Sequence, residues 1–443
     1  MKRSIVALLC LNLFLITSIA GDLVNPEKPN IEISNQKAVY GTPVSIKISN
    51  LEPGDTIKIE TVSTDARGVV WKASVTFQVG GKGDIVLEED APISGDYDEA
   101  DALGLFWSMK PEGTEKEKLL YAYDRQKSLV VSVMASDSKG LVATAEIERY
   151  YEDPQNKLAY QELNEDGLRG SLYYPDSNRK YPGVILLSGS GGGDVKWLAK
   201  AIASDGFSVL TLPYFNYPGL PGELVNIPLE YFEDAVMWMK KQAAIKEGNI
   251  GLVGGSRGGE LVLQLGSMFD EFGAIVAWSP AAHLWMGENY VELVPSWTYQ
   301  GKALSYLGSV FSEEEMQKFM RGELTSFVEY FRNSLKNSDP ELVKKASIPV
   351  ERIKANLFFL AGTDDQTWPS ADFTRIMIAR LKENDFGYDY QYIQAEGGGH
   401  MVFLPDLITG YYRAYNGGTP KEELSSSLDA WRAALAFLHK YLD

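Results

Sequence analysis

Short runs that alternate apolar and polar residues fill the first third of the chain. The sequences VSIKI at 44–48 and VTFQV at 75–79 are two examples, and such alternation is typical of strands with one buried face. Turn sequences such as EPGD at 52–55 separate these runs at short intervals. The pattern predicts an antiparallel β-sandwich over residues 22–153. We interpret it as a structural module, because nothing in it is arranged for chemistry.

The pattern changes after Tyr160, beyond a polar segment at 152–156. Near-continuous apolar runs at 184–187, 209–212 and 357–360 now alternate with amphipathic segments of helical spacing. Fully buried strands that alternate with helices predict a parallel sheet with helices on both faces. Residues 160–443 are therefore expected to form a second domain, of the α/β class.

The first residues of the chain carry a targeting pattern. Lys2 and Arg3 precede an apolar run that ends near Ile16, and the small-residue sequence Ser-Ile-Ala ends at Ala20. This pattern predicts a secretory signal peptide over residues 1–20, and hence an exported protein, periplasmic or secreted. A membrane anchor is the alternative, but the apolar run is shorter than the ~20 residues that a spanning helix needs.

Composition narrows the classes of partner and chemistry. The 443 residues have a net charge of −18, so the surface repels nucleic acid and anionic membranes. Cys10 is the only cysteine and lies in the predicted signal, which excludes disulfides and thiol nucleophiles from the mature chain. The three histidines are His283, His400 and His439. We therefore expect no metal centre and no cofactor, and a small molecule as the binding partner.

A G-x-S-x-G sequence at 254–258 makes Ser256 the candidate nucleophile. The preceding residues 249–253 read as a buried strand, and 260–268 have the apolar spacing of a helix. A sharp turn from strand into helix lifts a serine hydroxyl above the edge of an α/β sheet, and the glycines leave room for that turn. The alternative is a glycine-rich turn that carries an ordinary serine.

A serine nucleophile needs a histidine base that a carboxylate orients, and in α/β-hydrolases the chain order is Ser, Asp, His. Asp365 follows the predicted strand at 357–360 and is the candidate acid, with Asp364 second; a surface turn is the competing interpretation. His400 ends a glycine loop after the strand at 390–393 and is the candidate base; a cap of the next helix is the competing interpretation. His283 precedes the acid, and His439 lies in the last helix, where we expect it to be solvated.

The oxyanion of an acyl intermediate requires preorganised N–H donors. The backbone N–H of Arg257 is one candidate, and the loop at 187–193, with Ser190 and Gly191, supplies the other. Phosphate binding by this loop is the rival idea, but the loop lacks the lysine and hydroxyl ending of a P-loop.

Residues 284–347 are rich in aromatic side chains and do not follow the βα alternation. The stretch is too long for an ordinary loop, so we predict a mostly helical insertion. It either forms a lid over an acyl pocket or packs without touching substrate.

With these motifs in hand, the chain resembles the bile acid-CoA:amino acid N-acyltransferase and type I acyl-CoA thioesterase family over its full length after the signal. The resemblance rests on LEPG at 51–54, GLFWSM at 104–109, SGGG at 190–193, LPYFNY at 212–217, LEYFE at 229–233 and GSRGGEL at 255–261. It implies that Ser256 is the nucleophile, Asp365 the acid and His400 the base. Serine in place of the cysteine of the conjugating members implies hydrolysis of acyl thioesters, with water as acceptor.

Export departs from the family pattern, since its familiar thioesterases work where CoA is present. An exported carboxylesterase or peptidase on the same scaffold is the alternative, and a non-catalytic binding module is a third. Arg257, with Lys196 and Lys200, offers local positive charge for an anionic substrate, although ordinary salt bridges are the favoured interpretation of the two lysines.

Overall fold

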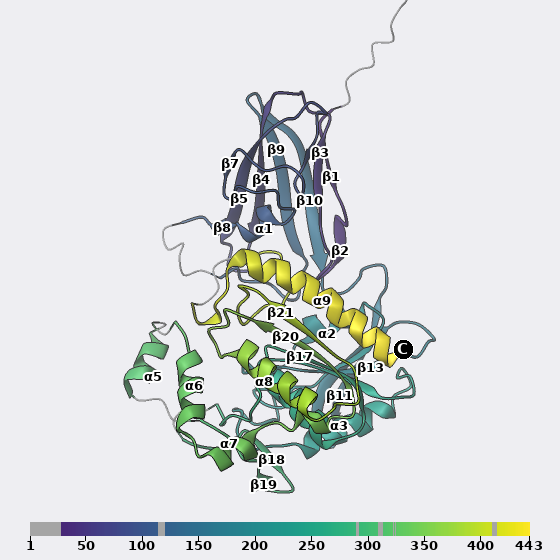
Figure 1. Ribbon diagram of the computed structural model, residues 1–443. Helices are drawn as coiled ribbons and strands as arrows, with labels where there is room; N and C mark the ends of the chain where they lie inside the picture. The colour runs from purple at the N-terminus through teal and green to yellow at the C-terminus, as the bar shows by residue number, and fades with distance from the viewer. Residues whose placement is uncertain are drawn as a thin grey trace, which may run out of the picture.

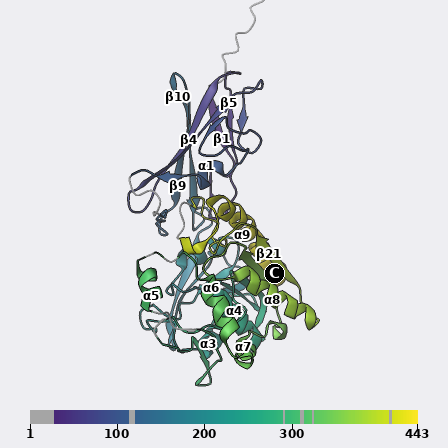
Figure 2. The same ribbon diagram turned by 60° about the vertical axis from the view of Figure 1, so that its left-hand side comes forward.

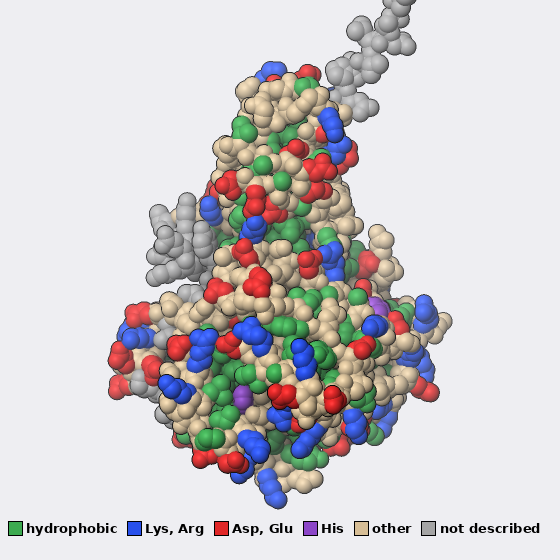
Figure 3. All heavy atoms as spheres, viewed as in Figure 1, with side chains coloured by type: hydrophobic (Ala, Val, Ile, Leu, Met, Phe, Trp, Pro, Cys, Tyr) green, Lys and Arg blue, Asp and Glu red, His purple; other side chains and the backbone are tan. Residues whose placement is uncertain are grey.

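The computed structural model describes residues 28–113, 120–288, 292–308, 313–321, 323, 325–409 and 414–443. The predicted signal peptide, residues 1–20, lies outside the described residues. A β-rich domain stands on a larger α/β domain, and the long helix α9 (Pro420–Leu442) lies between the two in both views (Figure 1, Figure 2). Basic and acidic side chains are interspersed on the face seen in Figure 3. None of the described helices combines the length and the apolarity that crossing a membrane requires.

Two sheets packed on one apolar core form the first domain, as predicted. The small sheet has the order β1 (Asn30–Ile33), β3 (Ile46–Ser49), β6 (Ile85–Val86), and the large sheet has the order β2 (Lys37–Val39), β10 (Gly140–Tyr150), β9 (Leu129–Asp137), β4 (Thr56–Thr64), β5 (Val70–Gln78), β7 (Ser94–Gly95), with β8 (Lys110–Pro111) also on β5. Every second residue of β5, from Trp71 to Phe77, is buried, which explains the alternation in the sequence. Strand β2 pairs parallel with β10, so the large sheet is not wholly antiparallel.

The second domain has the predicted α/β-hydrolase fold, built on one eight-stranded sheet. Its order is β11 (Leu158–Glu165), β12 (Leu168–Pro175), β14 (Ser208–Thr211), β13 (Gly183–Leu187), β16 (Ile250–Gly255), β17 (Phe272–Trp278), β20 (Asn356–Gly362), β21 (Tyr390–Ala395). Only β12 runs antiparallel to its neighbours. Because the other strands are parallel, their carboxyl ends meet at one edge, where the predicted site residues lie.

Successive residues of the central strands point to opposite faces of the sheet, and helices cover both faces. In β13, Ile185 and Leu187 join the core beneath one set of helices, and Val184 and Leu186 join the other. The first set is α3 (Glu230–Lys240), α4 (Arg257–Met268) and α8 (Ser370–Glu383), and the second is α2 (Lys196–Ala203) and α9. The double burial explains why the strands read as continuous apolar runs.

Among the described residues of the 284–347 stretch, α-helices lie only in the second half, so the expected mostly helical insertion needs correction. Helices α5 (Glu313–Met320), α6 (Val328–Asn337) and α7 (Pro340–Ala346) lie there. The first half contains a hairpin of β18 (Trp297–Tyr299) and β19 (Lys302–Ala303), and β15 (Ile227–Pro228) pairs with β18. Gln300 and Gly301 have φ of 50° and 69°, a turn that suits tight hairpins.

The two domains share apolar packing at their junction. Leu424 and Leu428 of α9 and Leu407 and Ile408 of the loop before it belong to the core cluster of the sandwich. Short α1 (Gly104–Trp107) of the sandwich contacts α9 as well. The last helix therefore belongs structurally to both domains.

Gly41, which follows β2, lies against Trp431 of α9 and gives a test of this packing. Its φ is 82°, and a Cβ added there would lie 2.4 Å from Cδ1 of Trp431. Gly68 has the same φ but faces open space. We expect Gly68→Ala to lower the free energy of unfolding by about 1 kcal/mol through backbone strain, and Gly41→Ala by about 2–4 kcal/mol, because overpacking adds to that strain. Urea denaturation of both variants measures the difference, and equal losses would contradict a tight junction.

Candidate active site

Ser256 stands at the turn between β16 and α4 with φ 56° and ψ −124°. A non-glycine residue rarely holds a positive φ unless its surroundings enforce it. A Cβ at Gly254 would lie 2.4 Å from the carbonyl oxygen of Gly258, and one at Gly258 would lie 2.6 Å from that of Ser188. Only glycine fits at both places, which is the physical reason for the G-x-S-x-G spacing. The turn presents Ser256 at the carboxyl edge of the sheet.

Asp365 and His400 meet at the same edge. Asp365 follows β20, His400 follows β21, and 2.9 Å separates the carboxylate Oδ2 from the imidazole Nδ1. Both residues are buried. The backbone N–H groups of Thr367 and Trp368 donate to Oδ1 of Asp365. The carboxylate is thereby fixed against the ring. A carboxylate in this position holds a histidine in one orientation and one tautomer.

Asp364, the second candidate acid, turns away from the histidine. Its Oδ2 accepts from the backbone N–H of Gly418 at 2.8 Å and its Oδ1 from the side chain of Gln366 at 2.7 Å. The structure therefore brings Asp365, and not its neighbour, to His400.

The end of β17 ties the serine and the histidine to one point of the sheet. The backbone N–H of Ser256 donates to the carbonyl of Trp278 at 2.9 Å, and the hydroxyl of Ser279 donates to the carbonyl of His400 at 2.8 Å. Trp368 packs edge-on against the His400 ring and lines the same cavity as Ser256. Two consecutive residues of one strand end thus hold the backbones of both predicted site residues.

The loop after β13 lies beside the Ser256 turn. A Cβ added at Gly189 would lie 3.2 Å from Cβ of Ser256 and 3.8 Å from the backbone nitrogen of Arg257. Ser190 lines the cavity and donates its hydroxyl to Glu288 at 2.7 Å. Gly191 is exposed, and its carbonyl accepts from Asn216 at 2.9 Å. Gly189, one residue before the predicted pair, thus lies against the Ser256 turn.

The Arg257 side chain is a buried, paired cation, which corrects the idea that it offers free positive charge. Its Nη1 lies 2.5 Å from Oε2 of Glu260, and its Nε lies 3.5 Å from Oε1 of Glu288. Nη2 also donates to the hydroxyl of Ser296. Burial raises the pKa of Glu260 to about 7 against the opposing effect of Arg257, and burial likewise raises the pKa of Glu288. The positive charge of Arg257 is thus paired with carboxylates inside the protein.

Lys196 and Lys200 are engaged in ion pairs, as the favoured interpretation had it. Lys196 lies 3.5 Å from Asp194, and Lys200 lies 2.9 Å from Glu152.

Among the described residues, no group of three or more His, Cys, Asp and Glu is arranged to hold a metal ion.

A cavity of about 210 Å³ opens in front of Ser256. Its wall is mostly aromatic and apolar, and half of its lining residues come from the 284–347 stretch. The lining residues are Ser190, Ser256, Arg257, Trp285, Met286, Glu288, Phe327, Tyr330, Phe331, Thr367, Trp368 and Tyr415. Of the two interpretations of that stretch, the one in which it covers the pocket agrees with this wall.

The other two histidines are not among the residues that line this cavity. His283 is buried, and burial together with the nearby Arg380 charge lowers its pKa to about 4. His439 in α9 is not simply solvated: its Nδ1 lies 2.8 Å from Asp443 and its Nε2 lies 3.0 Å from Asp205.

Sequence reasoning missed two acidic residues of the site, Glu288 and Glu423. Glu288 contacts both Ser190, in the loop after β13, and Arg257. Glu423 is buried in the first turn of α9, and its Oε1 accepts the backbone N–H of Gly399, next to His400, at 2.7 Å. Thr419 and Pro420 mark the start of α9 in the sequence, which locates Glu423 near that helix end. Glu423 is buried against the loop at Gly399, which is distant in the sequence, so no local sequence pattern identifies it.

Both domains match family models. Residues 41–158 match the acyl-CoA thioester hydrolase/BAAT N-terminal region, and residues 227–443 match the BAAT/acyl-CoA thioester hydrolase C terminal. Among curated proteins, acyl-coenzyme A thioesterase 1 of Mus musculus is 27% identical over 93% of this chain and 96% of its own length. The mitochondrial acyl-coenzyme A thioesterase 2 of Homo sapiens is 25% identical over 92% of this chain and 83% of its own length.

Solved structures that resemble the chain include a puromycin-hydrolysing peptidase of Mycobacterium tuberculosis and an esterase of Pyrococcus furiosus. The peptidase has a TM-score of 0.42 and 14% identity, with 90% of this chain and 65% of the peptidase covered. The esterase has a TM-score of 0.40 and 17% identity, with 65% of this chain and 92% of the esterase covered.

Glu423 makes stability depend on pH in a defined direction. Burial raises its pKa to about 8, above that of an unfolded chain, so the folded state binds the proton more tightly and loses stability as pH rises from about 4.5 to 8. Glu423→Gln removes this dependence and keeps an oxygen for Gly399. Comparing unfolding free energies at pH 5 and pH 8, we expect the wild type to lose on the order of 3 kcal/mol more than the variant. If the difference in unfolding free energy between wild type and variant were the same at pH 5 and pH 8, Glu423 would not be a buried, protonated carboxyl.

Proposed function

The chain belongs to the acyl-CoA thioester hydrolase/BAAT family, and we propose that it hydrolyses acyl thioesters through an acyl-serine on Ser256, with Asp365 and His400 as the other members of a catalytic triad. One observation carries this proposal: the buried Asp365–His400 hydrogen bond lies at the sheet edge where β17 also anchors the backbone of Ser256. The aromatic cavity in front of Ser256 supports an acyl chain as the group that is bound there.

In the acylation step, Ser256 Oγ attacks the thioester carbonyl while Nε2 of His400 takes its proton. Asp365 accepts the Nδ1–H of the ring, which leaves Nε2 as the acceptor and stabilises the imidazolium that forms. The backbone N–H of Arg257 and the loop with Ser190 and Gly191 stabilise the oxyanion. The carbon–sulfur bond then breaks, and His400 returns the proton to the departing thiolate.

In the deacylation step, His400 takes a proton from a water molecule that attacks the acyl-serine carbonyl. The carbon–oxygen bond to Ser256 breaks, and the proton passes from His400 to the serine oxygen. The carboxylic acid leaves, and the enzyme returns to its starting state. Water is the acceptor in this scheme, which agrees with the names of the curated relatives, acyl-coenzyme A thioesterases 1 and 2.

We also propose that residues 1–20 direct the chain to export, supported by the charge and hydropathy of its start. The substrate is then a thioester met outside the cytoplasm. The three cations that the sequence offered for an anionic substrate are paired: Arg257 with two carboxylates, and Lys196 and Lys200 with one each. Recognition accordingly rests on the acyl group rather than on a charged leaving group.

Ser256→Ala tests the nucleophile directly. Without Oγ, no acyl-enzyme forms, so we expect kcat/KM for acyl-CoA hydrolysis to fall by roughly 10³-fold or more. A thiol-release assay across acyl-CoAs of different chain length measures it. Ser267→Ala, on the same helix but with its hydroxyl bonded to the carbonyl of Gln264, is the control and should keep full activity. Turnover by Ser256→Ala at the wild-type rate would refute the scheme.

The two neighbouring aspartates give a matched pair for the acid. Asp365→Asn places an amide against Nδ1 and disfavours the tautomer that accepts the serine proton, so kcat should fall by about 10³–10⁴-fold. Asp364→Asn changes the same charge one residue away, on a carboxylate that bonds Gly418, and should change kcat by less than about threefold. Equal effects of the two substitutions on kcat would mean that Asp365 does not orient the base.

A further inference from the structure

The segment that follows His400 leaves the α/β domain and is held by the sandwich. Asp406 is buried, and both of its oxygens are bound by Arg125: Nη1 lies 2.7 Å from Oδ1 and Nη2 lies 2.7 Å from Oδ2. The hydroxyl of Tyr40 donates to Oδ1 at 2.7 Å. A bidentate arginine–carboxylate contact of this kind fixes the orientation of the two groups as well as the distance between them.

A second contact fixes the same segment two residues on. The hydroxyl of Tyr123 donates to the carbonyl of Ile408 at 3.0 Å and accepts the backbone N–H of Ile408 at 2.9 Å. The side chain of Ile408 is buried in the sandwich core. Residues 406–408 are thus bound to the sandwich by side-chain charge, backbone hydrogen bonds and apolar packing together.

Arg125 is itself enclosed by rings from both domains. Its guanidinium carbon lies 4.1 Å from the ring centre of Trp197 in α2 and 4.2 Å from that of Tyr123 in the sandwich. Nη1 of Arg125 also donates a hydrogen bond to the hydroxyl of Tyr151 at 2.9 Å. A guanidinium stacked between aromatic faces has little freedom to move.

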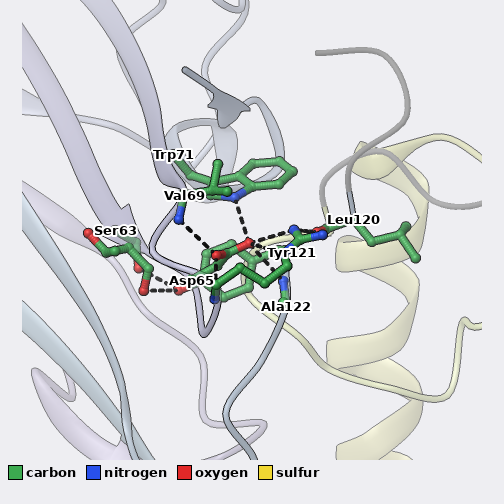
Figure 4. A network of polar contacts seen from close by, with 9 residues as sticks. Ser63, Asp65, Val69, Trp71, Leu120, Tyr121 and Ala122 are labelled. Carbon is green, nitrogen blue, oxygen red and sulfur yellow. Dashed lines mark hydrogen bonds and ion pairs between the residues drawn. The ribbon is translucent and has the colours of Figure 1, made fainter. Parts of the chain in front are cut away.

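A network of polar contacts in the sandwich, shown in Figure 4, fixes the chain just before Tyr123 and Arg125. The buried carboxylate of Asp65 accepts the backbone N–H groups of Val69 and Ala122 at 3.0 and 3.3 Å, and the hydroxyls of Ser63 and Tyr121 lie 2.7 Å apart. These bonds attach residues 120–122 to the end of β4, just before Tyr123 and Arg125. The base of the contact is therefore the sandwich sheet itself.

The segment is short and hydrogen-bonded within itself, so its anchored end and its catalytic end move together. Asp406 stands six positions after His400. The backbone N–H of Leu404 donates to the carbonyl of Met401 at 3.0 Å, and that of Asp406 donates to the carbonyl of Leu404 at 2.7 Å. A shift at Asp406 is thus passed along consecutive turns to the base.

We propose that Arg125 of the sandwich is a positioning residue of the active site, which acts through Asp406 to hold His400 against Asp365 and Ser256. This inference rests on the function proposed above. It gives the sandwich a role in the reaction, whereas its sequence pattern indicates a structural module only. Misplacing a catalytic group by about 1 Å is enough to slow a reaction by up to 10²-fold.

The test is the rate at which a fluorophosphonate inactivates the full-length mature enzyme, since this reaction depends on serine activation and needs no thioester. We expect Arg125→Gln and Asp406→Asn each to lower the second-order rate constant about tenfold, with complete labelling at the end point. Arg125→Lys, which keeps the charge but not the two-pronged contact, should fall between them and the wild type. In thioester turnover, kcat should fall while KM stays unchanged.

The control is Glu99→Gln, which removes another cross-domain ion pair, with Lys421 of α9, that does not involve residues 400–409. It should retain the wild-type rate, and far-UV circular dichroism with thermal melting establishes that every variant is folded at the assay temperature. If the wild type labels and the Arg125 and Asp406 variants label equally fast, the positioning role is wrong and the proposed function stands. If the folded wild type does not label at all, the proposed function fails, and this inference fails with it.

Discussion

The positive φ of Ser256 is the constraint on which the arrangement of the site depends. A residue held at φ 56° between a buried strand and a buried helix needs neighbours that allow close backbone contact. Gly254 and Gly258 supply that room, and the carbonyl of Trp278 holds the Ser256 amide. Because Ser279, the next residue, holds the backbone of His400, the strained turn and the histidine loop share one support. The strain is sustained by packing on every side, which keeps the serine pointed at the cavity.

The Arg257 charge next to Ser256 is paired with buried carboxylates and does not face solvent. Arg257 directly follows the serine, yet its guanidinium is buried between Glu260 and Glu288 and bonded to Ser296. A buried arginine with two carboxylates contributes more to fixing one arrangement than to net stability, because desolvation offsets most of the attraction. The pairing ties the first turn of α4 to residues 285–288 and, through Glu288, to the Ser190 hydroxyl. The Ser256 turn, the loop after β13 and the aromatic wall of the cavity are thereby one connected unit.

The sequence predicted what periodicity and local turn chemistry determine. The sandwich, the α/β sheet and the strand–turn–helix at Ser256 follow from alternation, buried runs and glycine spacing. Chain order pointed to the loop after the 357–360 strand, and the third position after its glycine favoured Asp365 over Asp364. The hairpin of β18 and β19 was missed, because aromatic content alone does not separate strand from helix. Glu288, Glu423 and the Arg125–Asp406 pair were also missed. Their meaning lies in contacts across long sequence separations, 281 residues for the last pair, and no local pattern encodes those.

We propose that an acyl group is transferred from the thioester to Ser256 and from there to water. The most direct test is to quench the mature enzyme with acid during turnover of a long-chain acyl-CoA and to map the mass increase by peptide mass spectrometry. We expect an increase equal to the acyl group on the peptide that contains Ser256, which disappears when turnover is complete. Continued turnover with no adduct, or with the acyl group on another residue, would contradict this proposal.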